Sequence, residues 1–245
     1  MLKNLAAKLR RARSAVELAV IESDDLPTRI EEAYTTALDS VDQVSAWKIG
    51  GASTWSRAAL GADHIFFGPL TAFEVFKETK TLEISHLFKP LCEPEVMLEI
   101  GDPDAEDPIG QFTRFALGFE IPASVLPDWA KESLVGQVAD RAGAGALWIG
   151  PSRALDPNLL TAHFDGEFCL NREEHYSANS EGLIGGPLGV AQDFLDLAKK
   201  QSIQVEAGQW IATGGLVPAV CVKPGDQVLF TALSDAVSVR FVCRR

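Results

Sequence analysis

Hydrophobic residues recur at helical spacing over the first 44 residues and gather in short runs thereafter. The break at Asp24-Asp25-Leu26-Pro27-Thr28 divides the first segment into two predicted helices, and Thr28-x-x-Glu31 is a candidate capping box for the second. From Trp47 onward, β-prone runs alternate with Gly and Pro turns, which predicts strands. These runs cover residues 47–49, 65–67, 96–100, 147–149, 228–232 and 237–243. We therefore expect a helical region at residues 1–45 and a strand-rich region at residues 46–245.

Two further helices are predicted to interrupt the strands, one around residues 127–138 and one at residues 187–201. The second has apolar residues at helical spacing, namely Leu188, Ala191, Phe194, Leu195 and Ala198. Helices mixed with many short strands predict an α+β fold in which the strands form a roll or a sandwich. No repeat, low-complexity tract or interdomain linker divides the chain.

Composition and charge narrow the kind of partner. The chain has 245 residues, of which 47% are hydrophobic, so it can bury a sizeable core. Its net charge of −12 disfavours attraction to nucleic-acid phosphates and to anionic lipid, and no apolar run reaches the roughly 20 residues that span a bilayer. The four cysteines are scattered, without zinc-site or disulfide-framework spacing. We expect a cytoplasmic protein that binds a small molecule and neither nucleic acid nor membrane.

Glu93 and Glu95 are candidate metal ligands. Side chains alternate between the two faces of a strand, so these two carboxylates point the same way and can bind one hard cation. Glu120, which lies between apolar Phe119 and Ile121, is a candidate third ligand from a neighbouring strand. The alternative is that the glutamates form the solvated face of an edge strand. Glu99 continues the same face but lies too far along the strand to join the first three.

Lys48, Arg141 and the paired glycines each have two possible roles. Lys48 lies in an apolar, β-prone segment, where desolvation can lower the pKa of a lysine toward acid–base use, or the ammonium can bind a carboxylate; it can equally point outward from an edge strand. Arg141 can bind a second carboxylate of a substrate or pair with an acid of the protein. Paired glycines such as Gly214-Gly215 can bring backbone N–H groups to an anion, although they more often form tight turns.

Several segments, taken in order, resemble the hydratase/decarboxylase branch of the fumarylacetoacetate hydrolase superfamily. Together they span nearly the whole chain. They are Glu31-Glu32-Ala33-Tyr34, Trp47-Lys48-Ile49-Gly50, Phe67-Gly68-Pro69-Leu70, Glu93-Pro94-Glu95, Phe119-Glu120-Ile121, Val138-Ala139-Asp140, Gly186-Pro187-Leu188, Thr213-Gly214-Gly215 and Pro224-Gly225-Asp226.

The resemblance implies a small helical N-terminal part on a mixed β-sheet roll of the fumarylacetoacetate hydrolase C-terminal type. It also implies Mg²⁺ or Mn²⁺ held by three carboxylates. Carried over position by position, the metal ligands fall on Glu93, Glu95 and Glu120, the pocket lysine on Lys48, and a position near the substrate carboxylate on Thr213. Related enzymes commonly form homo-oligomers, so we expect an assembly here too.

The chain departs from the family pattern at three places. After Val-Ala-Asp the family usually continues Asn-Ala-Ser, whereas this chain has Arg141-Ala142-Gly143. The acidic residue that usually follows Phe-Gly-x-Leu is absent at Ala72, and Glu74 is the nearest acid. Many members have Gly-His-Pro where this chain has Gly185-Gly186-Pro187.

The activity implied by the resemblance is a divalent-metal-dependent lyase acting on a small 2-oxo or 2-hydroxy-dienoate acid. The first hypothesis is hydration of a substrate of the 2-hydroxypenta-2,4-dienoate type. The alternative within the branch is decarboxylation of the 2-oxo-3-hexenedioate type. An acylpyruvate-type C–C hydrolase would need a base to activate water, and no histidine takes that role in the sequence. The replacements at Ala72, Arg141 and Gly143 keep open a non-catalytic, metal-dependent binder of oxo acids.

Overall fold

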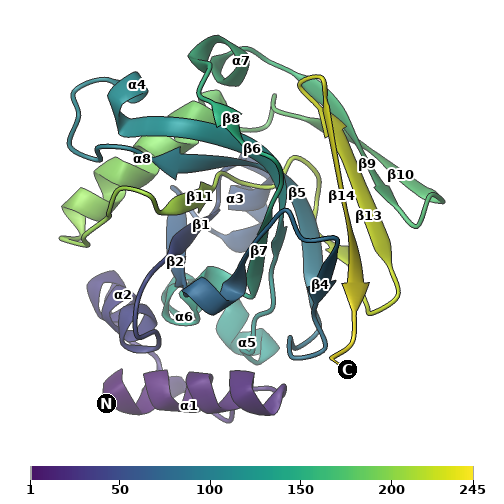
Figure 1. Cartoon of the computed structure of the whole chain (residues 1–245). Helices are drawn as coiled ribbons and strands as arrows, with labels where there is room; N and C mark the ends of the chain where they lie inside the picture. The colour runs from purple at the N-terminus through teal and green to yellow at the C-terminus, as the bar shows by residue number, and fades with distance from the viewer. Residues whose placement is uncertain (1, 245) are drawn as a thin grey trace.

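The computed structural model describes residues 2–244, which form two β-sheets with helices at their edges (Figure 1). The N-terminal part contains α1 (Leu2–Ala15), the short 3-10 helix η1 (Ser23–Asp25) and α2 (Ile30–Asp39). Two helices before the first strand confirm the predicted order of elements. The predicted capping box is wrong, because the N-cap of α2 is Arg29 and no side chain caps that helix end.

The larger sheet is a curled mixed sheet with the strand order β2-β1-β11-β5-β6-β7-β3. Two short strands join it beside this path, β12 against β5 and β8 against β6. The bounds are β1 (Ala46–Gly50), β2 (Phe66–Leu70), β3 (Val75–Lys77), β5 (Leu91–Ile100), β6 (Phe112–Ile121), β7 (Ala146–Ile149), β8 (Arg153–Ala154), β11 (Trp210–Ala212) and β12 (Val220–Cys221). Most neighbours are antiparallel, whereas β1–β11 and β3–β7 are parallel.

The second sheet has five strands in the order β10-β9-β13-β14-β4 and lies at the right of Figure 1. Its strands are β4 (Thr81–Glu83), β9 (Asp165–Leu170), β10 (Glu174–Asn179), β13 (Gln227–Ala232) and β14 (Asp235–Val242). Buried and more exposed residues alternate along β14, so one face packs inward and the other faces solvent. The mixed α+β roll predicted from the sequence is therefore confirmed.

The remaining helices are short except for α8. They are α3 (Thr54–Leu60), η2 (Ala72–Glu74), α4 (Pro108–Gln111), α5 (Asp128–Lys131), α6 (Leu134–Ala139), η3 (Arg141–Gly143), α7 (Pro157–Thr161) and α8 (Gly186–Lys200). The structure confirms the helix predicted at 187–201. The single helix predicted around 127–138 is wrong, because the segment forms α5 and α6 with a new N-cap at Ser133. Within residues 2–244, no helix is both long and apolar enough to cross a bilayer.

An aromatic cluster joins the N-terminal helices to the large sheet. Tyr34 of α2 stacks on Phe67 of β2 with ring centroids 4.6 Å apart, and Phe67 also meets Trp47 of β1 and Phe194 of α8 at 5.5 and 4.9 Å. Leu5 of α1 belongs to the same buried core. The helices therefore share one core with the strands, and the division at residues 45 and 46 stays a prediction.

The two faces of the large sheet have different contents. Trp47 and Ile49 of β1 face the main core, whereas Ala46 packs on the opposite face in a smaller cluster with Met97 and Ala212. Because side chains alternate along a strand, Lys48 shares the face of Ala46, and Glu95 shares the face of Met97. The candidate site lies on this second face.

Candidate metal centre

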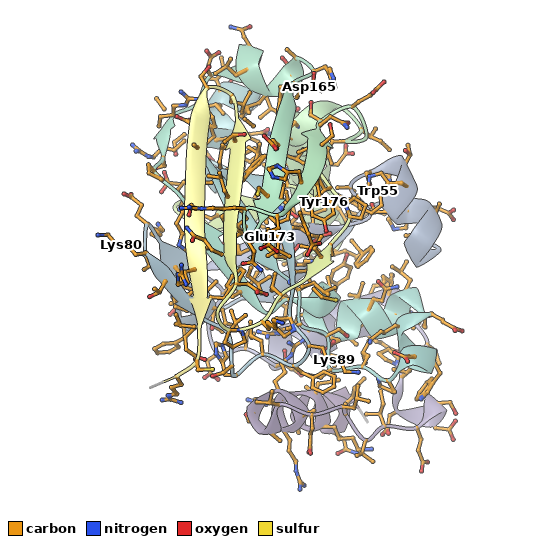
Figure 2. All side chains as sticks on the ribbon, turned by 90° about the vertical axis from the view of Figure 1, so that its right-hand side faces the viewer. Trp55, Lys80, Lys89, Asp165, Glu173 and Tyr176 are labelled. Carbon is orange, nitrogen blue, oxygen red and sulfur yellow. The ribbon has the colours of Figure 1, made fainter. Side chains whose placement is uncertain are left out.

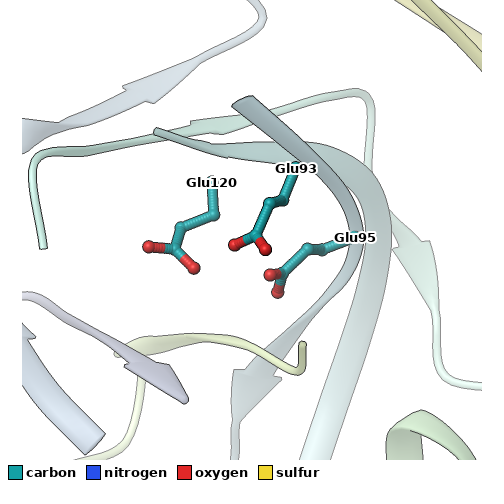
Figure 3. A group of neighbouring side chains, drawn as sticks. All are labelled: Glu93, Glu95 and Glu120. Carbon is teal, nitrogen blue, oxygen red and sulfur yellow. The ribbon is translucent and has the colours of Figure 1, made fainter. Parts of the chain in front are cut away.

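Three glutamates converge on one face of two paired strands. Glu93 and Glu95 lie on β5, Glu120 lies on β6, and the antiparallel register places Glu93 directly opposite Glu120. Figure 3 shows the three carboxylates directed toward one another, and one oxygen from each lies within 4.8 Å of the others. The structure therefore brings together the three residues that the sequence and the family resemblance select as ligands.

Burial makes this arrangement costly for the protein alone. Glu95 and Glu120 are 0% and 1% exposed. Burial, followed by the negative charge of Glu120, raises the pKa of Glu93 to about 8. The pKa of Glu95 rises well above its usual value for the same two reasons, with a further contribution from Glu93. Burial also raises the pKa of Glu120 despite the opposing positive charge of Lys48. Three acids held this closely favour a bound positive charge.

The oxygen atoms themselves fit a hard divalent cation. Oε1 of Glu95 and Oε2 of Glu120 are buried without a hydrogen-bond partner, and Oε1 of Glu120 has only the ammonium of Lys48 close by, at 3.1 Å. Buried hydrogen-bond acceptors need a partner. A cation can be that partner here, because Mg²⁺ and Mn²⁺ prefer carboxylate oxygens as ligands. The alternative of a solvated edge strand is wrong, because β5 is paired on both sides, with β6 and with β11.

Lys48 of β1 places a positive charge beside the three carboxylates. Its side chain is buried, and its Nζ atom lies 3.1 Å from Oε1 of Glu120. Burial lowers the pKa of Lys48, but the charges of Glu120, Glu93 and Glu95 outweigh burial and leave the pKa above its usual value. Of the two states that the sequence left open, the raised pKa favours an ammonium beside the acids. The catalytic role of Lys48 stays a prediction.

Thr213 and the two glycines that follow form the wall of the site next to Glu95. The Thr213 hydroxyl donates a hydrogen bond of 2.9 Å to the carbonyl of Val96, so it fixes the turn at the end of β11. The backbone N–H of Gly214 donates to Oε2 of Glu95 at 2.7 Å. A Cβ atom added at Gly215 would lie 3.0 Å from Oε1 of Glu93. The anion that this glycine pair approaches is thus the protein's own carboxylate, and Thr213 as a substrate-binding residue stays a prediction.

Arg141 is engaged elsewhere. Its guanidinium donates to both carboxylate oxygens of Glu74, at 2.9 and 2.8 Å. Arg13 of α1 forms a second, partly buried pair with Asp140, at 2.6 Å, and both arginines line a cavity of about 60 Å³. The structure thus shows the second of the two roles open to Arg141, pairing with an acid of the protein. Its role in substrate binding stays a prediction without support from this geometry.

We expect the Glu74–Arg141 pair to make stability depend on pH. Burial raises the pKa of Glu74, but the positive charge and hydrogen bonds of Arg141 outweigh burial, so the pKa lies below the ordinary value of 4.5. A carboxylate with a depressed folded-state pKa contributes stability above its unfolded-state pKa, and that stability is lost as pH falls through the folded-state pKa.

Glu74→Gln should therefore lower the free energy of unfolding by about 3 kcal/mol near neutral pH, because it leaves a buried guanidinium without its counter-charge. The difference from the natural protein should shrink in acid. Urea unfolding followed across this pH range measures both effects, and the exposed Glu132→Gln is the matched control. A difference that stays constant down to acid pH would contradict the ion pair as its source.

The chain is similar to known enzymes in sequence and in fold. The chain is 32% identical over 187 residues to a 2-keto-4-pentenoate hydratase from Paraburkholderia xenovorans (strain LB400), covering 73% of this chain and 68% of the relative. It is 26% identical over 202 residues to a 4-oxalocrotonate decarboxylase from Pseudomonas sp. (strain CF600), covering 78% and 75% of the two chains. No protein-family model matches the chain.

The fold agrees with these relatives. The structure of 4-oxalocrotonate decarboxylase from Pseudomonas putida G7, complexed with magnesium and adipate, superimposes with a TM-score of 0.86 at 21% identity, covering 98% of this chain and 97% of that one. This likeness shows the same mixed α+β architecture in both proteins. The chain belongs to the hydratase/decarboxylase branch of the fumarylacetoacetate hydrolase superfamily.

Proposed function

We propose that this protein is a divalent-metal-dependent lyase that hydrates a small 2-hydroxy-dienoate acid of the 2-hydroxypenta-2,4-dienoate type. The observation that carries the proposal is the buried cluster of Glu93, Glu95 and Glu120, whose oxygen atoms lie within 4.8 Å of one another. The 32% identity to a hydratase over most of the chain supports the reaction class.

Glu93, Glu95 and Glu120 would hold Mg²⁺ or Mn²⁺. When bound, the ion supplies a Lewis acid that polarises the keto group of a 2-oxo acid. The chain itself keeps the ligands in place: the Gly214 N–H fixes one oxygen of Glu95, and the hydrogen bond of Thr213 to Val96 holds that turn against β5. Glycines bring backbone close to two of the carboxylates, because Gly118 of β6 lies opposite Glu95 and Gly215 lies against Glu93.

Lys48 is the residue that we assign to proton transfer. Its Nζ atom lies beside Glu120, where it presents an N–H donor to the same space that the carboxylates face. There the ammonium can bind the carboxylate of an oxo acid or deliver a proton at Nζ to a carbon of the substrate. The low exposure of the site excludes bulk water from this proton, so that protonation depends on the lysine.

Decarboxylation is the second candidate, because a 4-oxalocrotonate decarboxylase is also among the relatives. A dicarboxylate substrate needs a cation for its far carboxylate, and Arg141 is the residue that the sequence offers for it. Since both oxygens of Glu74 already occupy that guanidinium, the geometry favours a monocarboxylate substrate and therefore the hydratase.

Turnover of a panel of acids separates these functions. The metal-stripped protein should be tested with and without Mg²⁺ on 2-hydroxypenta-2,4-dienoate, 2-oxo-3-hexenedioate and an acylpyruvate. We expect loss of the dienoate chromophore only with Mg²⁺ and without CO₂ release. If CO₂ release from 2-oxo-3-hexenedioate is the main activity, the protein is a decarboxylase and not a hydratase. If oxalate stabilises the protein against heat and no acid of the panel is turned over, the protein is a non-catalytic binder of oxo acids.

We further infer that the protein works in the cytoplasm as a homo-oligomer. Its four cysteines are all free, and two of them, Cys221 and Cys243, are exposed, which suits a reducing compartment. The oligomer rests on the analogy with related enzymes. Light scattering coupled to size-exclusion chromatography measures the mass, and a monomer at micromolar concentration would contradict the assembly.

A further inference from the structure

A second group of reactive side chains lies far along the chain from the glutamates, on the solvent-facing side of the five-stranded sheet. Figure 2 shows this sheet turned toward the viewer, with Asp165 and Tyr176 marking β9 and β10. Cys169 of β9 and His175 of β10 are direct partners in the antiparallel register. The Cys169 Sγ atom lies 3.7 Å from Nε2 of His175, and Nδ1 of His175 is hydrogen-bonded to Oε1 of Glu167.

The order of these three groups is that of a nucleophile, a base and a residue that orients the base. A carboxylate is an acceptor only, so the hydrogen bond that Nδ1 of His175 donates to Glu167 keeps a proton on that nitrogen. In the neutral ring the lone pair of Nε2 then faces the thiol and can accept its proton. A cysteine is weakly nucleophilic as a free thiol and becomes reactive when a neighbouring base takes this proton.

The surroundings narrow the chemistry that this thiol can perform. β9 is an inner strand, paired with β10 on one side and with β13 on the other, so the ladders on both sides use its backbone N–H groups. Acyl transfer needs free donors for a developing oxyanion, and the strand offers none at Cys169. On β13 the residue opposite Cys169 is Leu229, which is 38% exposed and gives the thiol an apolar neighbour.

We propose that Cys169 is a modification site for small α,β-unsaturated carbonyl compounds. In this reaction the thiol proton moves to Nε2 of His175, and the sulfur forms a bond to the β-carbon of the electrophile. The electrons of the C=C bond move to the carbonyl as an enolate, which takes a proton back at the α-carbon. The net change is addition of S–H across the double bond, with no leaving group, oxidant or oxyanion-stabilising amide required.

Acrylamide is a suitable probe, because it is a small and slow acceptor that ordinary thiols consume sluggishly. The folded protein is incubated with acrylamide, and the rate of adduct formation at each cysteine is followed by peptide mass spectrometry. Cys169 is only 5% exposed, whereas Cys221 and Cys243 are exposed. If accessibility alone decided the rate, Cys169 would react more slowly than both. We expect it to react faster than both, by about tenfold or more.

Two variants test the base and its orienting residue. His175→Asn should lower the rate at Cys169 by about tenfold or more, and Glu167→Gln by a smaller factor, with the rates at Cys221 and Cys243 unchanged. The matched control is His163→Asn, because His163 lies 3.5 Å from Asp165 in an exposed His–Asp pair that includes no thiol. In urea all these proteins should label Cys169 at one common rate, which shows that the effect belongs to the folded arrangement.

Three results would overturn the proposal. The first is a rate at Cys169 below those of the exposed cysteines. The second is an unchanged rate in a folded His175→Asn protein, verified by its thermal unfolding. The third is rapid oxidation of Cys169 by hydrogen peroxide without any acrylamide adduct, since that would assign the thiol to peroxide instead.

Discussion

Replacing Glu95 with glutamine is expected to lower the affinity for Mg²⁺ by at least about 100-fold while the protein stays folded. Two unit charges 4 Å apart interact by about 4 kcal/mol at the effective dielectric constant of a protein, and about 1.4 kcal/mol is a factor of ten in affinity. Glutamine keeps the shape and one oxygen but removes the charge. Calorimetric titration of the metal-stripped protein with Mg²⁺ and Mn²⁺ measures the change.

The same substitution should raise the thermal stability of the metal-free protein. Glu95 is buried among acids that raise its pKa, so a neutral side chain of equal size relieves both burial and repulsion. The matched control is Glu99→Gln, because Glu99 lies on the same strand and face but bonds to Thr113 outside the cluster. Equal Mg²⁺ affinity in the Glu95→Gln and Glu99→Gln proteins would remove Glu95 from the metal site.

Lys48→Met is expected to lower turnover of the dienoate by about 100-fold or more, the usual size of a general acid–base contribution. Metal binding should persist and even tighten, because the variant removes a positive charge 3.1 Å from Glu120. Methionine preserves most of the side-chain volume in this buried position. Steady-state kinetics at saturating Mg²⁺, together with the calorimetric titration, measures both effects.

The exposed Lys77→Met serves as the control, since Lys77 lies over the Trp210 ring on a strand that bears none of the proposed ligands. Full turnover in Lys48→Met would confine Lys48 to balancing the charge of the glutamates. If the variant loses metal binding as well as turnover, Lys48 has a structural role in holding the metal ligands in place.

The sequence could predict the parts of the fold that hydrophobic spacing specifies. The amphipathic run of α8 and the apolar cores of β1, β5 and β13 were predicted close to their observed positions. The hairpin of β9 and β10 was missed, because its solvent-facing side carries Glu167 and His175, which break the apolar pattern of a strand. Its pairing depends on burial of the other face, which only the second sheet supplies.

The candidate site was predictable to the extent that it depends on spacing within one strand. Alternation along β5 placed Glu93 and Glu95 together, whereas the position of Glu120 depended on the family resemblance and on a register that sequence alone does not reveal. The direction of the pKa shift of Lys48 is a sum over three carboxylates from two other strands. The partner of Arg141 is 67 residues away, and no local pattern links it to Glu74.

The position of β11 between β1 and β5 determines when the acids become enclosed during synthesis. On the ribosome, β5 and β6 can form their hairpin once residue 121 has emerged, but β11 is more than 80 residues further along the chain. Until β11 arrives, the edge of β5 is bare and water reaches the three carboxylates. A nascent chain thus offers them openly to a cation, and β11 then encloses whatever they hold.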